Sequence, residues 1–164
     1  MGLSASGTTP FVRGGLEYAK KQGAGTVLIA CNQTTMAADV TVVVPTGPEV
    51  VTGSTRMKAA TAQRMVLTML STTMAVRLGL VYDNLMVAMT SRNAKCQKRA
   101  LAILREISDE DEQTCHQALE FAQGDLRLAA LLLRTRDLES ARKLLAQTQG
   151  SLRGALGRAE AEKR

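Results

Sequence analysis

The first half of the chain alternates between short β-branched runs and helical patterns. Two runs without polar alternation, residues 26–31 and 39–44, predict strands covered on both faces of a parallel sheet. Residues 10–22 have a helical pattern, with Pro10 suited to a first turn and Gly23 placed to end the helix. Together these elements predict an α/β unit with a partial parallel sheet and flanking helices.

A long helix is predicted at residues 54–78, closed by Gly79 as a C-cap. Its middle, residues 65–76, is apolar or weakly polar and lies between Arg64 and Arg77. This run is well short of the ~20 residues that a bilayer requires, so we interpret it as a buried helix and expect no membrane interaction. The apolar positions expected in the core include Met57, Met65, Leu70 and Met74.

From residue 92 onward the pattern becomes entirely helical. Ser108 with Asp111 resembles a capping box, while Asp125 and Asp137 each precede an apolar-periodic segment. The predicted helices span residues 92–107, 109–122, 125–134, 137–147 and 151–160.

One motif recurs within this helical region. Residues 123–129, Gln-Gly-Asp-Leu-Arg-Leu-Ala, return 26 residues later as residues 149–155, Gln-Gly-Ser-Leu-Arg-Gly-Ala. Two copies predict a helical hairpin repeat and are too few for a solenoid. The helix-Gly-helix spacing suits a compact three-helix unit of the ubiquitin-associated (UBA) type. We therefore expect residues 92–164 to form a helical linker and a small UBA-like domain, following a domain at residues 1–91.

Composition places the chain among globular proteins, with 45% hydrophobic residues and a mean hydropathy of −0.03. The net charge of +6 divides evenly between the two halves, and the few aromatic residues are scattered. They do not make the stacking platform of single-strand binders, so we expect no nucleic-acid partner. A helix-turn-helix in the second half is the alternative, and we rank it low.

Three further features of the sequence limit the metal sites, cofactors and cellular location that we expect. The cysteines, Cys31, Cys96 and Cys115, are odd in number and widely spaced, which predicts reduced, mostly buried thiols and no metal site. Neither a Walker loop nor a dinucleotide-binding motif occurs, so no cofactor is expected. The N-terminus lacks the features of a signal peptide, which predicts a cytoplasmic location.

A loop rich in small hydroxyl residues precedes the first predicted helix. Residues 4–9 read Ser-Ala-Ser-Gly-Thr-Thr, so hydroxyls and free amides gather at one helix N-terminus. A phosphate prefers several short donors and the positive end of a helix dipole, which makes this loop a candidate phosphate site. The alternative is an ordinary helix cap. Because this loop lies only a few residues from Met1, we expect the strand that should lead into it to be missing.

The stretch from Gly47 to Gln63 leads a turn into the long predicted helix. Arg56 and Lys58 lie beside the expected cap residues Ser54 and Thr55, although cations at a helix N-terminus are unfavourable without an anion nearby. This arrangement predicts an anion site. The alternative is that both cations are solvated or pair with Glu49.

Glu49 is the candidate catalytic carboxylate within this stretch. Gly47 and Pro48 fix its approach, and the cations at positions 56 and 58 follow closely. A carboxylate in this position can act as an acid or a base. It can equally hold the loop by pairing with Arg56, and the sequence leaves both roles open.

The pattern resembles the signature of N-acetylmuramic acid 6-phosphate etherases and the related glucokinase regulatory protein. Residues 47–58, Gly-Pro-Glu-Val-Val-Thr-Gly-Ser-Thr-Arg-Met-Lys, carry most of this resemblance. Ala60 departs from the expected glycine. Further matching segments are residues 61–63, 69–72, 77–79, 81–82, 84–87 and 93–95.

The resemblance implies a sugar isomerase (SIS) type domain, of which residues 1–91 are similar to the C-terminal half. It implies contacts with the phosphate of a sugar phosphate by the loop at residues 4–9, and a homodimer. The substrate-binding residues it implies are Ser4, Ser6, Gly7, Thr9, Glu49, Ser54, Thr55, Arg56 and Lys58.

The reaction implied is cleavage of the lactyl ether of N-acetylmuramic acid 6-phosphate to N-acetylglucosamine 6-phosphate and D-lactate, during peptidoglycan recycling. It uses two carboxylates, one to remove the C2 proton and one to help lactate leave. The resemblance assigns the family's glutamates to sequence preceding Met1, so we expect a sugar-phosphate-binding fragment that is inactive alone. The alternatives are a non-catalytic sugar-phosphate sensor, or a helical adaptor that keeps a degenerate SIS remnant.

Overall fold

The computed structural model describes residues 1–89 and 93–161. It divides into two compact units, Met1–Ser71 and Thr72–Arg164. The boundary expected after residue 91 lies outside the described residues, as does Arg92, the expected first residue of a helix.

The first unit is built on a three-stranded parallel sheet in the order β1-β2-β3. The strands span Gly2–Ser4 (β1), Val27–Ala30 (β2) and Val40–Val43 (β3). The two strands predicted from β-branched runs are confirmed as β2 and β3. The expectation that no strand precedes the loop at residues 4–9 is wrong, because three residues suffice for β1 to pair with β2.

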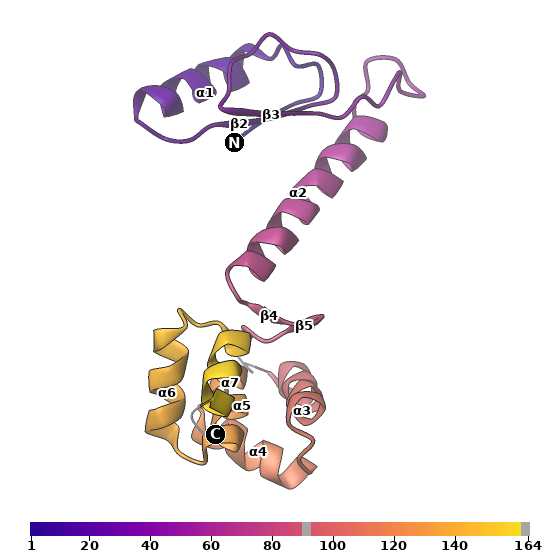
Figure 1. Ribbon diagram of the computed structural model, residues 1–164. Coiled ribbons are helices and arrows are strands. Elements are labelled where there is room, and N and C mark those ends of the chain that lie inside the picture. Colours follow the sequence, from indigo (N-terminus) through magenta and orange to yellow (C-terminus); the bar gives the residue numbers. More distant parts are fainter. Residues whose placement is uncertain (90–92, 162–164) are drawn as a thin grey trace. The chain divides into compact units, whose positions relative to one another are not determined.

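Helix α1, Pro10–Lys21, is confirmed with Pro10 in its first turn. Figure 1 shows α1 on one side of the sheet, and its buried Leu16 packs with Leu28 of β2 and with Met36. The sequence also predicts that β2 and β3 are covered on both faces, and for β3 this is not what the structure shows. Its first two residues, including Val40, are exposed. This sheet is therefore only partly covered by its own unit.

Helix α2 spans Lys58–Arg77, so it begins four residues later than predicted. The expectation of a buried helix is wrong: of its twenty residues only Ala59 is buried. Within the first unit, all of whose residues the structure describes, no layer covers the apolar side chains along this helix. The positions expected in the core but found exposed are Met57, Met65, Leu70 and Met74.

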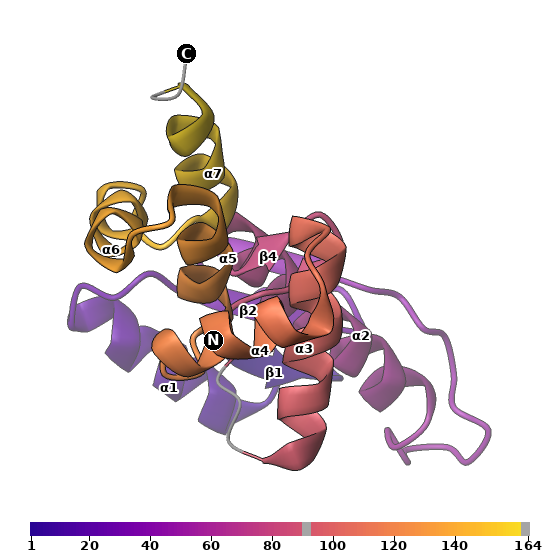
Figure 2. The ribbon, with the colours of Figure 1, turned by 90° about the horizontal axis from the view of Figure 1, so that it is seen from below.

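The second unit begins with the end of α2 and a short hairpin, followed by five helices. The hairpin pairs β4, Val81–Tyr82, with β5, Leu85–Met86. Figures 1 and 2 show α5 in the middle of the helices, and it contacts α3, α4, α6 and α7. The helices span Ala94–Ser108 (α3), Glu112–Phe121 (α4), Leu126–Thr135 (α5), Leu138–Gln147 (α6) and Leu152–Ala161 (α7).

The starts of α3, α4, α5 and α6 are capped by acidic or amide side chains. Asp125 and Asp137 are confirmed as N-caps, and both accept backbone N–H groups. The capping box expected at Ser108 is wrong. Ser108 is the last residue of α3 and donates to the Leu104 carbonyl, while Asp111 alone caps α4.

The sequence repeat corresponds to two turns with the same backbone conformation. Gln123 and Gly124 join α4 to α5 with φ of 53° and 81°, and Gln149 and Gly150 join α6 to α7 with φ of 52° and 82°. Arg127 of the first copy donates to the Gly150 carbonyl of the second at 3.3 Å. All five helices contribute to one apolar core, and the UBA-like type of this unit stays a prediction.

Asp39 ties the start of β3 to the start of β2, and it makes the stability of the first unit depend on pH. Its carboxylate accepts from the Thr26 hydroxyl at 2.7 Å and the Thr26 N–H at 2.8 Å, and it pairs with Lys20. These interactions lower the pKa of Asp39 from 3.8 to about 2. The unfolded chain therefore binds the proton more readily, and the stabilisation is complete above about pH 4 and lost as the pH falls towards 2.

We expect Asp39→Asn to lower the melting temperature of the first unit at neutral pH. The variant should also lose less stability than the unmodified chain between pH 4 and pH 2, measured by thermal melting. Glu17→Gln, an exposed change on α1, is the matched control. Identical acid profiles for the unmodified chain and Asp39→Asn would contradict this role.

Candidate functional site

The loop between β1 and α1 is held by a buried serine. Ser4 is only 3% exposed, and its hydroxyl accepts the Gly7 N–H at 3.0 Å and is hydrogen-bonded to the Thr9 hydroxyl at 2.8 Å. Ser6, which is exposed, accepts from the N–H and the hydroxyl of Thr8. The structure therefore brings Ser4, Ser6, Gly7 and Thr9 together, as the sequence predicts, in one tight turn.

The N-terminus of α1 is left open to an anion. Thr9 is the N-cap residue, but its hydroxyl bonds to Ser4 and makes no cap bond to the helix backbone. The first turn contains no acidic residue, and Pro10 occupies its first position. The positive end of the helix dipole is thus not neutralised within this turn, which is the condition that favours a phosphate.

The segment after β2 clamps this loop from behind. The Ala5 carbonyl accepts from the Cys31 N–H at 3.2 Å and from the Asn32 side chain at 2.9 Å. Thr34 donates its hydroxyl proton to the Gly7 carbonyl at 2.6 Å. Sequence reasoning missed Asn32 and Thr34. The available signal was their place directly after a predicted parallel strand, because loops at the carboxyl ends of such strands meet.

The second predicted junction is organised by Glu49. Its two carboxylate oxygens accept the N–H groups of Lys58 and Ala59, each at 3.0 Å. The side-chain ammonium of Lys58 donates instead to the Pro48 carbonyl, at 2.8 Å. The anion expected at this helix N-terminus is therefore Glu49 of the same chain.

The other candidates at this junction lie before the helix. The expectation that Ser54 and Thr55 cap it is wrong, because α2 begins only at Lys58 and the Glu49 carboxylate takes the capping position. Within the part of the chain that the structure describes, the side chains of Ser54, Thr55 and Arg56 make no hydrogen bond or ion pair. Arg56 is exposed. Pairing of Glu49 with Arg56, one of the open alternatives, is not the arrangement found.

The pKa of Glu49 follows from this geometry. Hydrogen bonds from the backbone N–H groups of Ala59 and Lys58 hold the pKa of Glu49 below its ordinary value. The carboxylate is ionised at neutral pH, which suits a helix cap and makes Glu49 a poor proton donor. Its role as an acid or base stays a prediction.

We expect Glu49→Gln to loosen the start of α2, because the negative charge at the helix end is lost. Glu49→Ala should loosen it more, because both hydrogen-bond acceptors are lost as well. Amide hydrogen exchange at Lys58 and Ala59 should accelerate several-fold. Glu17→Gln on α1 is again the matched control. Unchanged exchange at these two amides would contradict the capping role.

Cys31 connects the two junctions at the carboxyl end of β2. Its N–H binds the Ala5 carbonyl of the first loop, and its thiol donates to the Ala59 carbonyl of α2 at 3.7 Å. Burial raises the pKa of the Cys31 thiol, so it remains protonated and acts as a packing group. The loop at residues 4–9 and the start of α2 are therefore neighbours, on either side of one buried residue.

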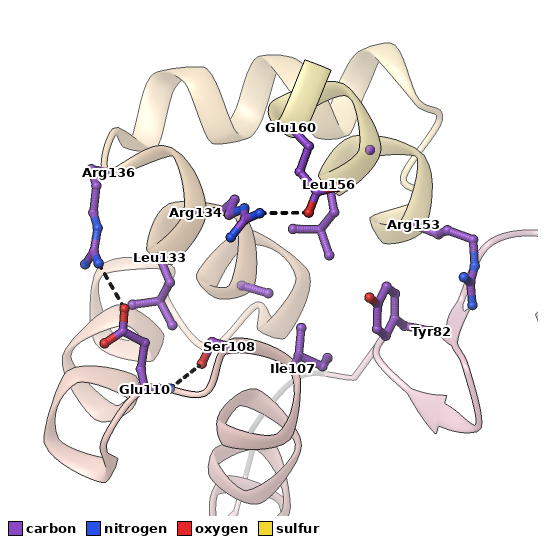
Figure 3. A pocket seen from close by; sticks show the side chains of 12 residues that line it. Tyr82, Ile107, Ser108, Glu110, Leu133, Arg134, Arg136, Arg153, Leu156 and Glu160 are labelled. Atoms are coloured by element: carbon purple, nitrogen blue, oxygen red, sulfur yellow. Dashed lines mark hydrogen bonds and ion pairs between the residues drawn. The ribbon is translucent and has the colours of Figure 1, made fainter. Parts of the chain in front are cut away.

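The second unit contains a cavity of about 420 Å³ between α3, α5 and α7, shown in Figure 3. It is lined by three arginines, but each is already paired with a carboxylate. We therefore do not treat this cavity as the functional site. The pairs are Arg134 with Glu160, Arg136 with Glu110, and Arg153 with Asp83.

Two further properties concern the described residues as a whole. Residues 1–89 and 93–161 contain no group of three or more histidines, cysteines and carboxylates placed to hold a metal ion. None of the helices in these ranges combines the length and apolarity needed to span a bilayer.

Comparison with curated proteins relates nearly the whole chain to N-acetylmuramic acid 6-phosphate etherases. It is 43% identical to that of Pseudoalteromonas atlantica over 164 residues, which cover 98% of the chain and 53% of the relative. It is 48% identical to the etherase of Pseudothermotoga lettingae over 161 residues, which cover 95% of the chain and 53% of the relative. It is 40% identical to the etherase of Bacillus subtilis over 158 residues, which cover 94% of the chain and 52% of the relative.

A scan against protein-family models finds no match. The chain spans about half the length of the curated relatives it matches. The resemblance seen in the sequence is confirmed, and the chain is a relative of the N-acetylmuramic acid 6-phosphate etherases along almost all of its residues.

Proposed function

We propose that this chain supplies a sugar-phosphate-binding part of an N-acetylmuramic acid 6-phosphate etherase, and that the loop at residues 4–9 binds the phosphate. The observation that carries the proposal is the open N-terminus of α1, where Thr9 turns its hydroxyl to Ser4 and leaves the helix backbone uncapped. The names of the relatives support the sugar phosphate as ligand.

Each loop residue has a distinct part in this proposal. The phosphate accepts from backbone N–H groups of the first turn of α1 and from the exposed hydroxyl of Ser6. Ser4 is buried, so it shapes the loop through Gly7 and Thr9 and does not touch the ligand. Arg56, exposed and unpaired within the described residues, supplies a cation for the anion.

The proposed reaction is cleavage of the lactyl ether to N-acetylglucosamine 6-phosphate and D-lactate. Proton transfer at the sugar requires a carboxylate with a pKa near the working pH, and the lowered pKa of Glu49 argues against that residue. We propose that the acid and the base lie in the part of the family's sequence that this chain does not span. The purified chain alone should therefore release no lactate from N-acetylmuramic acid 6-phosphate.

The test is thermal melting of the chain with N-acetylglucosamine 6-phosphate, compared with unphosphorylated N-acetylglucosamine. A ligand at 100 times its dissociation constant stabilises the folded state by about 2.7 kcal/mol, so the phosphorylated sugar should raise the melting temperature of the first unit. Lactate release is measured in parallel. Equal melting with both sugars would refute the phosphate site, and robust lactate release would place the acid and base in this chain.

The same proposal includes a cytoplasmic location and a homodimer, which the resemblance implies. Light scattering on the purified chain measures its mass and checks the second point.

A further inference from the structure

The last four helices of the second unit form two copies of one helical hairpin. α6 begins 26 residues after α4, and α7 begins 26 residues after α5, with equal helix lengths in each pair. The copies differ in the helix that ends each hairpin. Leu131 of α5 is fully buried, whereas its counterpart on α7 is Gly157. A Cβ atom added at Gly157 meets nothing within 4 Å, so space is left beside this position.

Gly157 lines the cavity of about 420 Å³ that Figure 3 shows. Glycine is less favourable than leucine in a helix interior, so this opening is kept at a cost to the helix. Ile107, Leu133 and Leu156 supply the apolar part of the lining. The volume lies near the lower end of the roughly 300–1,000 Å³ of small-molecule pockets, which suits a ligand of about the size of a dipeptide.

Charged side chains of both signs line the rest of the cavity. Arg134 pairs with Glu160 at 2.8 Å, and Arg136 pairs with Glu110 at 2.9 Å. In Figure 3 the first of these pairs lies between Arg136 on one side and Arg153 on the other. The lining therefore offers cationic donors and anionic acceptors together, with the arginines in the majority.

The ion pairs do not close this cavity to a ligand. A guanidinium carries five N–H donors in a planar fork, and Arg136 and Arg153 each reach their carboxylate through one nitrogen, Nη2. These two arginine side chains are 69% and 64% exposed, and exposed ion pairs contribute little to stability. Both arginines can therefore bind a further carboxylate at little cost to the fold.

We propose that this cavity binds a short acidic peptide with a free amino terminus. Its carboxylates bind Arg136 and Arg153, and its ammonium binds Glu160. An apolar side chain of the peptide packs on Leu133 and Leu156. A ligand with only negative charge, such as phosphate, is disfavoured because two glutamates line the same cavity. This proposal does not rest on the phosphate site of the first unit.

The experiment is a backbone amide NMR titration of the full chain with the dipeptide Leu-Glu, repeated with N-acetylated Leu-Glu and with inorganic phosphate. We expect the amides of Ile107, Arg134 and Gly157 to shift with Leu-Glu. Acetylation removes the ammonium and should weaken binding about tenfold or more, because Glu160 loses its charged partner. Phosphate should leave these amides of the second unit unchanged.

Two cavity variants have matched controls on α6, where Arg142 and Glu139 form an exposed ion pair. Arg136→Gln should weaken binding of Leu-Glu about tenfold, whereas Arg142→Gln should not. Glu160→Gln should weaken binding of Leu-Glu but not of its acetylated form, and Glu139→Gln should change neither. The amide spectrum of each variant shows that the unit is folded, so a loss of binding is not mistaken for unfolding.

The titrations also define the results that would overturn the proposal. One is that the amides of the second unit do not respond to Leu-Glu, or respond as strongly to phosphate. Others are equal binding of Leu-Glu and its acetylated form, and binding that Arg136→Gln and Glu160→Gln leave intact. The loop at residues 4–9 lies in the other unit, so a failure of the phosphate site leaves this result readable.

Discussion

Gly7→Ala is expected to abolish the stabilisation of the first unit by N-acetylglucosamine 6-phosphate. Gly7 has a φ of 73°, where a residue with a Cβ atom costs roughly 1–2 kcal/mol. A Cβ atom added there lies 2.9 Å from the Thr34 Cβ and 3.2 Å from the Gln33 carbonyl oxygen. The loop must therefore move, and Thr34 loses its hold on the Gly7 carbonyl.

The matched control for this variant is Gly15→Ala on α1. Nothing lies within 4 Å of a Cβ atom added at Gly15. In a helix interior alanine is more favourable than glycine by roughly 0.5–1 kcal/mol, so this variant should melt slightly higher and keep sugar-phosphate binding. Binding by Gly7→Ala that equals the unmodified chain would contradict the account of the loop.

Leu131→Ala is expected to cause a large loss of stability in the second unit. Leu131 is fully buried on α5, the helix that contacts α3, α4, α6 and α7. Removing a buried leucine side chain from such a core costs about 2–5 kcal/mol, because apolar contacts are lost and a cavity remains. Urea unfolding followed by circular dichroism measures the change in the free energy of unfolding.

Phe121→Ala is the control for the core variant. Phe121 is exposed at the end of α4, so its removal should change the free energy of unfolding by about 0.5 kcal/mol or less. Both variants should still be stabilised by N-acetylglucosamine 6-phosphate, because the proposed site lies in the first unit. Equal effects of the two substitutions would show that α5 is not the centre of this core.

Local patterns were sufficient to predict most of the elements. The β-branched runs gave β2 and β3, and Pro10 with Gly23 bracketed α1. In the second unit, Asp125 and Asp137 predicted helix starts because a cap acts within its own first turn. The gathering of Ser4, Ser6, Gly7 and Thr9 was predictable for the same reason, since their bonds span five residues or fewer.

Contacts between residues distant in sequence were not predictable. Glu49 caps α2 from nine residues upstream, so the start of the helix was misplaced at Ser54. Asn32 reaches the Ala5 carbonyl across 27 residues; its place after a predicted strand indicates the edge of the sheet but not its partner. The exposure of α2 was missed because an apolar sequence predicts burial but does not say which polypeptide supplies the cover.

The most direct test of the account is a backbone amide NMR titration of the 164-residue chain with N-acetylglucosamine 6-phosphate, repeated with N-acetylglucosamine. The account predicts that the amides of Ser6, Gly7 and Thr8 and of the first turn of α1 shift with the phosphorylated sugar only. Amides there that stay unchanged, or that shift equally with both sugars, would contradict it.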